Sequence, residues 1–213
     1  SDGKRSVPAV RKVGRPTGSN REETIARIRQ SAMQIFTEKG YAAASFKDIA
    51  RDINVTPATL YQYFDSKLTL YVSLFDEIFR QLKPRYQEAF GSQVHIRDQI
   101  RVMLATTLDN YAISPQHSPF LAGATIDIGR DPELREYFGQ RSGTLNDMIM
   151  EIFEQAKQRG ELPADLDSEN IASAFFGALM GIVWRQSGRQ SGSVEEAISI
   201  FLMMIENRLF QKA

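Results

Sequence analysis

The sequence predicts an all-α protein in which a small three-helix domain with a helix-turn-helix precedes a larger helical domain. Apolar residues recur at helical spacing along most of the 213 residues, and no convincing strand alternation interrupts them. Residues typical of helix starts and ends separate the apolar runs. We divide the chain into a flexible basic arm (residues 1–20), a helix-turn-helix domain (21–66) and a second helical domain (67–213).

The segment from Ser45 to Lys67 predicts two short helices joined by a tight turn. Ser45 and Asp48 match a capping box at the first helix start. Asn54 tolerates the left-handed backbone that reverses the chain. Thr56 and Pro57 then form a second helix start, because threonine accepts from free N–H groups and proline lacks the donor that would be unpaired there. These features indicate a helix-turn-helix.

The second of these helices has the features of a recognition helix for DNA. Leu60 and Phe64 are expected to face inward, which leaves small, hydrogen-bonding and aromatic groups outward, where they suit base edges, thymine methyls and phosphates. Lys67 lies at the start of the next helix, capped by Asp65 or Ser66, where a phosphate fits. The expected DNA contacts in this segment are Lys47, Thr56, Pro57, Ala58, Thr59, Tyr61, Gln62, Tyr63 and Lys67.

At these residues the chain resembles the tetracycline repressor (TetR) family of bacterial transcription regulators. The matching pieces are Gly40-Tyr41, Asp48-Ile49-Ala50, Val55-Thr56, Leu60-Tyr61-Gln62-Tyr63-Phe64 and Ser66-Lys67. Two residues depart from the family pattern, because Asn54 and Ala58 stand where glycine is common. The resemblance implies a regulator with a C-terminal domain for effector binding and dimerisation, and Ala58 leaves the base preference open.

Charge is distributed unevenly along the chain. Residues 1–70 hold 12 Lys and Arg against 7 Asp and Glu, a net +5, although the whole chain is neutral. Such local charge favours a polyanion, because each neutralised phosphate releases counterions. In the arm, Arg11, Lys12 and Arg15 resemble Gly-Arg-Pro arms that enter the minor groove. The alternative is a disordered tail that only adds solubility.

The remaining chain predicts further helices. The first helix should end at Gly40, and the helix that begins at Lys67 should run to about Phe90 with an interruption at Pro84, which should kink it or end it. Later helices are expected over residues 96–113, 120–128, 168–187 and 193–210. Asp131-Pro132 should start one long amphipathic segment that Gly160 closes.

The last two helices are apolar over more of their surface than one core requires. Gly177 and Gly181 permit close backbone approach between helices. The TetR resemblance implies that these helices form a four-helix dimer interface, and burial within one subunit is the alternative. The expected interface residues are Ile171, Phe175, Ala178, Ile182, Ile198, Phe201, Leu202, Ile205 and Leu209.

A pocket for a hydrophobic effector is the second feature expected of the C-terminal domain. Such a pocket combines apolar walls with a few polar groups, among which Arg141 would suit an anionic ligand. Ordinary core packing is the alternative for each residue. The candidate lining residues are Met103, Thr107, Tyr111, Phe120, Thr125, Phe138, Arg141, Met148, Phe176 and Trp184.

The sequence argues against an enzyme. His95 and His117 lack partners at metal-ligand spacing, and there is no phosphate loop or nucleophile elbow, so no metal and no cofactor is expected. The absence of cysteine and of an apolar leader suggests a cytoplasmic protein, bound to the nucleoid when on DNA. We therefore expect a homodimeric repressor of a palindromic operator, released by a small molecule. An activator, a partner-controlled regulator and a helical interaction module that has lost DNA binding are the alternatives.

Overall fold

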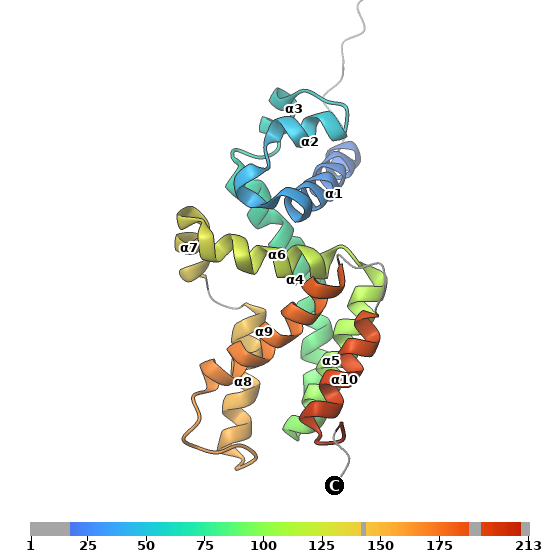
Figure 1. Cartoon of the computed structure of the whole chain (residues 1–213). Helices are drawn as coiled ribbons and strands as arrows, with labels where there is room; N and C mark the ends of the chain where they lie inside the picture. Colours follow the sequence, from blue (N-terminus) through green and yellow to red (C-terminus); the bar gives the residue numbers. More distant parts are fainter. Residues whose placement is uncertain (1–17, 142–143, 188–192, 210–213) are drawn as a thin grey trace, which may run out of the picture.

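The structure, a computed structural model, describes residues 18–141, 144–187 and 193–209, and every regular element in these residues is an α-helix. Figure 1 shows a head that α4 connects to a larger helical body. The head contains α1 (Gly18–Ala43), α2 (Phe46–Asp52) and α3 (Pro57–Tyr61), and α4 spans Lys67–Gly91. The body adds α5 (Ile96–Ile113), α6 (His117–Arg130), α7 (Pro132–Gly139), α8 (Leu145–Gln158), α9 (Ser168–Ser187) and α10 (Val194–Ile205). The predicted fold class is confirmed.

The head follows the predicted local signals closely. Ser45 and Asp48 form the capping box at the start of α2, and Thr56 caps α3 with Pro57 in its first turn. Asn54 adopts the left-handed conformation with φ 57°. Ser66, rather than Asp65, caps α4 by accepting a hydrogen bond from the Thr69 amide. These caps satisfy donors that each helix start leaves free, so the short helices are fixed by their own sequence.

The first helix begins earlier than expected, at Gly18, three residues inside the expected arm. Its regular helical backbone stops at Gly40, as predicted, where a kink separates it from a last turn that ends at Ala43. The fourth helix does not end at Pro84 but continues to Gly91. Proline removes only one backbone donor, and Leu82 and Tyr86, which flank it, are buried against the body and hold the helix in place.

The body also corrects two predictions. The segment expected to run as one helix from Pro132 to Gly160 is divided into α7 and α8. Thr144 caps α8 through a capping box with Asp147, a start signal that the apolar periodicity concealed. The helix predicted over 96–113 matches α5. The last helix ends at Ile205, short of the predicted end at 210, and Phe210 lies outside the described residues.

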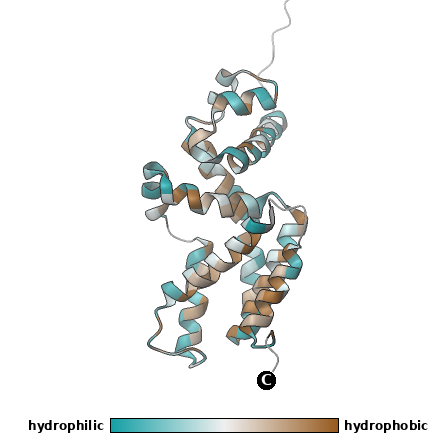
Figure 2. Ribbon diagram, in the orientation of Figure 1, coloured by the Kyte–Doolittle hydropathy of each residue, from teal (hydrophilic) through white to brown (hydrophobic). Residues whose placement is uncertain are grey.

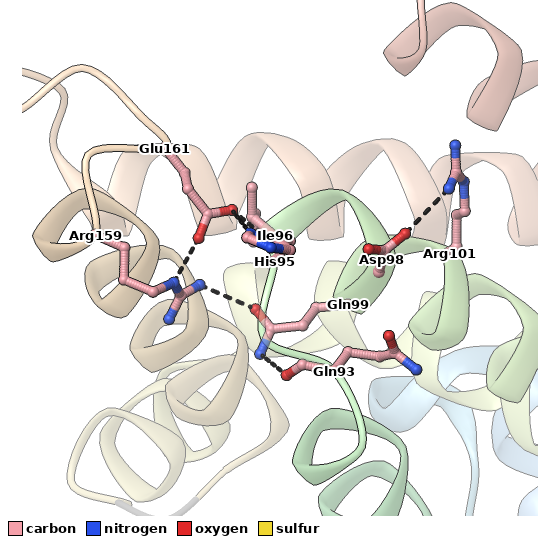
Figure 3. A network of polar contacts seen from close by, with 8 residues as sticks. All are labelled: Gln93, His95, Ile96, Asp98, Gln99, Arg101, Arg159 and Glu161. Atoms are coloured by element: carbon pink, nitrogen blue, oxygen red, sulfur yellow. Dashed lines mark hydrogen bonds and ion pairs between the residues drawn. The ribbon is translucent and has the colours of Figure 1, made fainter.

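The start of α5 is capped from a distant part of the chain. His95, at the N-cap position, makes no side-chain cap bond. Glu161, from the turn after α8, accepts a hydrogen bond of 2.7 Å from the Ile96 amide and also binds Arg159, which contacts Gln99 (Figure 3). These bonds lower the pKa of Glu161, chiefly through Arg159 and then the Ile96 amide. A carboxylate at a helix N-terminus is favourable, so this network ties α5 to the end of α8.

Hydrophobic residues are spread over the body helices, and much of α10 is brown in Figure 2. Within the described ranges, no helix is both long enough and apolar enough to cross a bilayer. The apolar residues instead form one continuous core that extends from the head through α4 into the body.

Candidate functional site

The predicted recognition surface lies at the far end of the head from the body (Figure 1). Lys47, on α2, and most of the predicted residues of α3 and its flanks have exposed side chains, while Leu60 and Phe64 are buried beneath them as expected. Thr59, Tyr63 and Lys67 are half-buried. The predicted contacts that are exposed are Lys47, Thr56, Pro57, Ala58, Tyr61 and Gln62.

Contacts within the head fix the orientation of several of these side chains. The Thr56 and Thr59 hydroxyls lie 3.0 Å apart. Tyr61 is 58% exposed, and its ring rests on Phe46 with a centroid separation of 4.8 Å. The Arg21 guanidinium lies 5.2 Å from the centre of the Tyr63 ring, which adds a positive charge beside the predicted interface. Arg11, Lys12 and Arg15 lie outside the described residues.

The structure gives Lys67 partners that the sequence did not indicate. Its ammonium donates to the Tyr41 carbonyl at 2.7 Å and to the Ala44 carbonyl at 3.2 Å, and it lies 4.3 Å from the centre of the Tyr41 ring. Carbonyls at a helix C-terminus lack intrahelical partners and attract cations. The ammonium therefore fastens the end of α1 to the start of α4, and its expected phosphate contact remains a prediction.

A second charged contact stabilises the start of α2. Hydrogen bonds from Ser45 and Lys39 lower the pKa of Asp48 to about 2. The Lys39 ammonium lies 2.9 Å from the Asp48 carboxylate. Because Lys39 belongs to α1, this ion pair helps to orient the helix-turn-helix on the first helix.

Tyr41 is the joint between the head and the body. Its amide donates to Asp127 of α6 at 3.0 Å, and its hydroxyl donates to Glu133 of α7 at 2.9 Å. The hydroxyl of the buried Tyr71, on α4, donates to the same Asp127 oxygen at 3.2 Å. Burial raises the pKa of both tyrosines above its usual value, and the neighbouring carboxylates raise it further. Both hydroxyls therefore keep their protons and remain hydrogen-bond donors.

The kink at Gly40 lets Asp127 approach this joint. Gly40 has φ 77°, a conformation that residues with a side chain rarely adopt. A Cβ atom there would also lie 3.1 Å from the Asp127 carboxylate. Gly40-Tyr41 was recognised in the sequence as part of a motif, but Asp127 and Glu133 were not predicted as its partners. No local feature of α6 or α7 shows what these two carboxylates contact.

The body contains a small internal cavity between α4, α5, α6, α8 and α9. Its volume is about 30 Å³, and it includes three of the predicted pocket residues, Met103, Thr107 and Phe176. The other lining residues are Leu82, Tyr86, Asn110, His117, Ser118, Leu121, Leu145, Ile149, Leu179 and Met180. Burial lowers the pKa of His117, although the charge of Glu77 opposes this, so the imidazole is neutral at pH 7. The cavity is predominantly apolar with one polar side.

The other predicted pocket residues do not line this cavity. Phe120 and Phe138 pack with Phe75 in an aromatic cluster. Arg141 is paired with Asp76, so it is not positioned to bind an anion in the cavity. Thr125 is exposed, and Trp184 is 59% exposed. Tyr111 and Met148 are partly buried core residues, as the core-packing alternative predicted.

Both α9 and α10 expose small or apolar side chains, and these exposed residues are called here the exposed face of α9 and α10. Gly177, Ala178 and Gly181 are exposed on α9, and a Cβ at either glycine would meet no other part of the protomer within 4 Å. The close packing that these glycines permit is therefore not found among the described residues. The exposed large hydrophobic residues of this face are Trp184, Ile200 and Met204.

The predicted interface residues divide into two groups. Phe175 and Ile198 are buried in the protomer's own core, so the expectation that they form an interface surface is wrong for these two. Both side chains pack inside the protomer, which the sequence pattern alone did not show. Ala178 is exposed, and the partly buried residues are Ile171, Ile182, Phe201, Leu202, Ile205 and Leu209.

An exposed helix-turn-helix on a helical body defines a class of DNA-binding regulators. Comparison with known proteins agrees. Residues 28–74 match the model for bacterial regulatory proteins of the tetR family, and residues 95–192 match a tetracyclin repressor-like C-terminal domain. Together the two matches span more than half of the chain. The protein belongs to the TetR family of helix-turn-helix transcriptional regulators, which are not enzymes.

Relatives and solved structures extend the likeness over most of the chain. The regulator SrpR of Pseudomonas putida is 25% identical over 198 residues, which is 91% of this chain and 90% of that protein. FadR of Bacillus subtilis, solved with stearoyl-CoA, has a TM-score of 0.70 at 19% identity, over 87% of this chain and 99% of that one. A Saccharomonospora viridis regulator solved with choline has a TM-score of 0.65 at 16% identity, over 90% and 100%.

Proposed function

We propose that this protein is a homodimeric repressor that binds a palindromic operator through α3 and leaves it when a small, mainly apolar effector occupies the cavity. The observation on which the proposal depends is the recognition surface, where α3 and its flanks expose Thr56, Pro57, Ala58, Tyr61 and Gln62. Thr59 and Gln62 are the candidate residues for base readout. Lys47 and the arm residues Arg11, Lys12 and Arg15 are the candidates for backbone or minor-groove contacts.

The exposed face of α9 and α10 supports the dimer. Small residues on α9 allow close approach of a partner helix, and the apolar side chains of Trp184, Ile200 and Met204 favour burial. A second copy suits this face because a twofold axis presents the same surface on both subunits. Two heads in such a dimer would meet successive major grooves if they lie about 34–36 Å apart.

The position of α6 supports control by an effector. His117, Ser118 and Leu121, near its start, line the cavity, and Asp127, near its end, holds Tyr41 of the head. An effector that favours a shifted α6 would change the head position and lower DNA affinity, provided that it binds the shifted state more tightly. The stearoyl-CoA and choline complexes of the two structural neighbours favour an organic effector for this chain too.

DNA binding can be tested with a palindromic fragment from the region upstream of the gene. Fluorescence anisotropy at several salt concentrations should give a steep fall of log affinity with log salt, because phosphate contacts release counterions. Thr59→Ala and Gln62→Ala should change base preference, whereas Lys47→Ala should weaken binding to all sequences and reduce the slope by about 1. Weak binding of equal strength to palindromic and scrambled fragments would favour the interaction-module alternative.

The dimer can be tested by placing a charge on its proposed interface. Ala178→Glu buries an unpaired carboxylate in the interface, which should weaken dimerisation on the order of 100-fold. Ala164→Glu makes the same change at an exposed position in the turn before α9 and serves as the control. Sedimentation velocity of both variants measures the effect. A variant Ala178→Glu that remains as dimeric as Ala164→Glu would place the interface elsewhere.

A further inference from the structure

The polar side of the cavity includes a buried hydrogen-bond donor that has no partner among the described residues. The Thr107 hydroxyl donates its single proton to the Met103 carbonyl at 2.9 Å. In the 2.8 Å contact between Tyr86 and Thr107, the tyrosine must therefore be the donor. Both hydroxyl protons are thus used within the protein, and neither is free for a ligand.

Asn110 is different, because its amide nitrogen is not paired. The side chain is only 8% exposed, and its Nδ2 forms no hydrogen bond with the described residues. The Arg85 guanidinium, which can only donate, binds Oδ1 and so fixes which end of the amide faces the cavity. Asn110 also lies close enough to Tyr86 to oppose, as a hydrogen-bond donor, the rise that burial causes in the pKa of that tyrosine. A side-chain amide has two N–H groups, so at least one of them remains for a ligand. A buried donor without a partner is costly, so a ligand that pairs with it gains affinity.

The charges around the cavity restrict what can pair with Asn110. Among the described residues, no carboxylate, ammonium or guanidinium group lines the cavity. A cationic ligand would find no counter-charge there, and Arg85 lies directly behind Asn110. A carboxylate ligand would be buried among neutral side chains with no cation in contact, and an ionised group in such surroundings is strongly disfavoured. A neutral acceptor avoids both penalties.

We infer that the cavity binds a neutral, largely apolar molecule whose carbonyl oxygen accepts a hydrogen bond from Asn110 Nδ2. This inference rests on the proposed role of the cavity as the effector site. The cavity volume of about 30 Å³ is much smaller than such a ligand, so the walls must move apart when it binds. Met103 and Met180 line the cavity, and methionine side chains repack readily.

The inference can be tested with probes of one shape and different polarity. Acetophenone has the carbonyl, isopropylbenzene replaces it with a methyl group, and 1-phenylethylammonium replaces it with a cation. Calorimetric titration of the full-length protein should show acetophenone binding that Asn110→Leu weakens about 5-fold to 10-fold, the effect of one hydrogen bond. The same substitution should leave isopropylbenzene binding unchanged or tighter, because leucine keeps the volume and removes only the polar group.

Asn110→Asp provides a second variant that keeps the side-chain shape and the contact with Arg85. This substitution removes the donor, so the affinity for acetophenone should again fall. It also adds a carboxylate, so 1-phenylethylammonium should bind the variant more tightly than it binds the wild type. Equal effects of Asn110→Leu on acetophenone and isopropylbenzene would overturn the inference, and so would a wild-type protein that binds none of the probes. Salt-dependent operator binding is measured separately, so in either case the proposed repressor function would stand or fall by its own test.

Discussion

Removal of the Asp127 carboxylate should loosen the head from the body. In Asp127→Ala, the Tyr41 amide and the Tyr71 hydroxyl both lose their acceptor, and both residues are buried. Hydrogen bonds to a charged group contribute about 1.5–3 kcal/mol each. The 3.2 Å contact of Tyr71 is the longer one, so we expect a total loss of about 3 kcal/mol.

Asp127→Asn distinguishes the hydrogen bonds from the charge. Both donors meet one oxygen of Asp127, and the asparagine carbonyl can replace that oxygen. The loss should then be about 1.5 kcal/mol, since neutral hydrogen bonds are roughly half as strong. For a chain of this length, Asp127→Ala should lower Tm by about 6–12 °C and Asp127→Asn by about 3–6 °C.

Thermal unfolding followed by far-ultraviolet circular dichroism measures both variants. Asp109→Ala, at an exposed aspartate on α5, is the control and should change stability by less than about 0.5 kcal/mol. The loosened head should also bind operator DNA more weakly in Asp127→Ala than in Asp127→Asn. An unchanged Tm in Asp127→Ala, or equal losses in the alanine and asparagine variants, would refute the role of Asp127 as acceptor for both donors.

The other charged groups of the head lead to two predictions. Lys67→Met should lower the free energy of unfolding by about 2 kcal/mol, because the Tyr41 and Ala44 carbonyls lose their charged donor. The control Lys47→Met changes an exposed lysine and should leave the free energy of unfolding unchanged in the same thermal melts. Equal losses in the two variants would contradict the role of Lys67 as the donor to these carbonyls. The pKa of Asp48 is lowered to about 2 from its usual 3.8, so its stabilising effect is complete above pH 4 and is lost as the pH falls toward 2. Carboxyl NMR titration should give this low pKa, and Lys39→Met should raise it; a pKa near 4 in the wild type would contradict the ion pair.

The helix-turn-helix could be predicted because its signals are local. Ser45 and Asp48 are three residues apart, and Thr56 precedes the proline of its own helix, so each cap is visible in a short window of sequence. The left-handed conformation of Asn54 follows from the chemistry of that one side chain. Short-range rules of this kind depend little on the rest of the molecule.

The joint could not be predicted, and only three lining residues of the cavity were, because the contacts of both join distant segments. Asp127 lies 86 residues after Tyr41, and Glu161 caps a helix that begins 65 residues earlier. The split of the apolar stripe on α9 and α10 into a buried side with Phe175 and an exposed side with Ala178 depends on where the neighbouring helices pack. Helical periodicity shows that a stripe exists but does not show which partner covers each edge.

One physical path between the cavity and the head is α6, which contributes residues to the cavity and to the contact with Tyr41. His117 and Asp127 are ten residues apart, which corresponds to about 15 Å along a helix. A helix is stiff over such a length, so a ligand that displaces the His117 end must shift or tilt the Asp127 end as well. Asp127 accepts hydrogen bonds from both α1 and α4, and a shift at this point is passed to both helices that orient α3. If α6 couples effector to operator in this way, Asp127→Ala should reduce effector-induced DNA release while leaving effector affinity nearly unchanged.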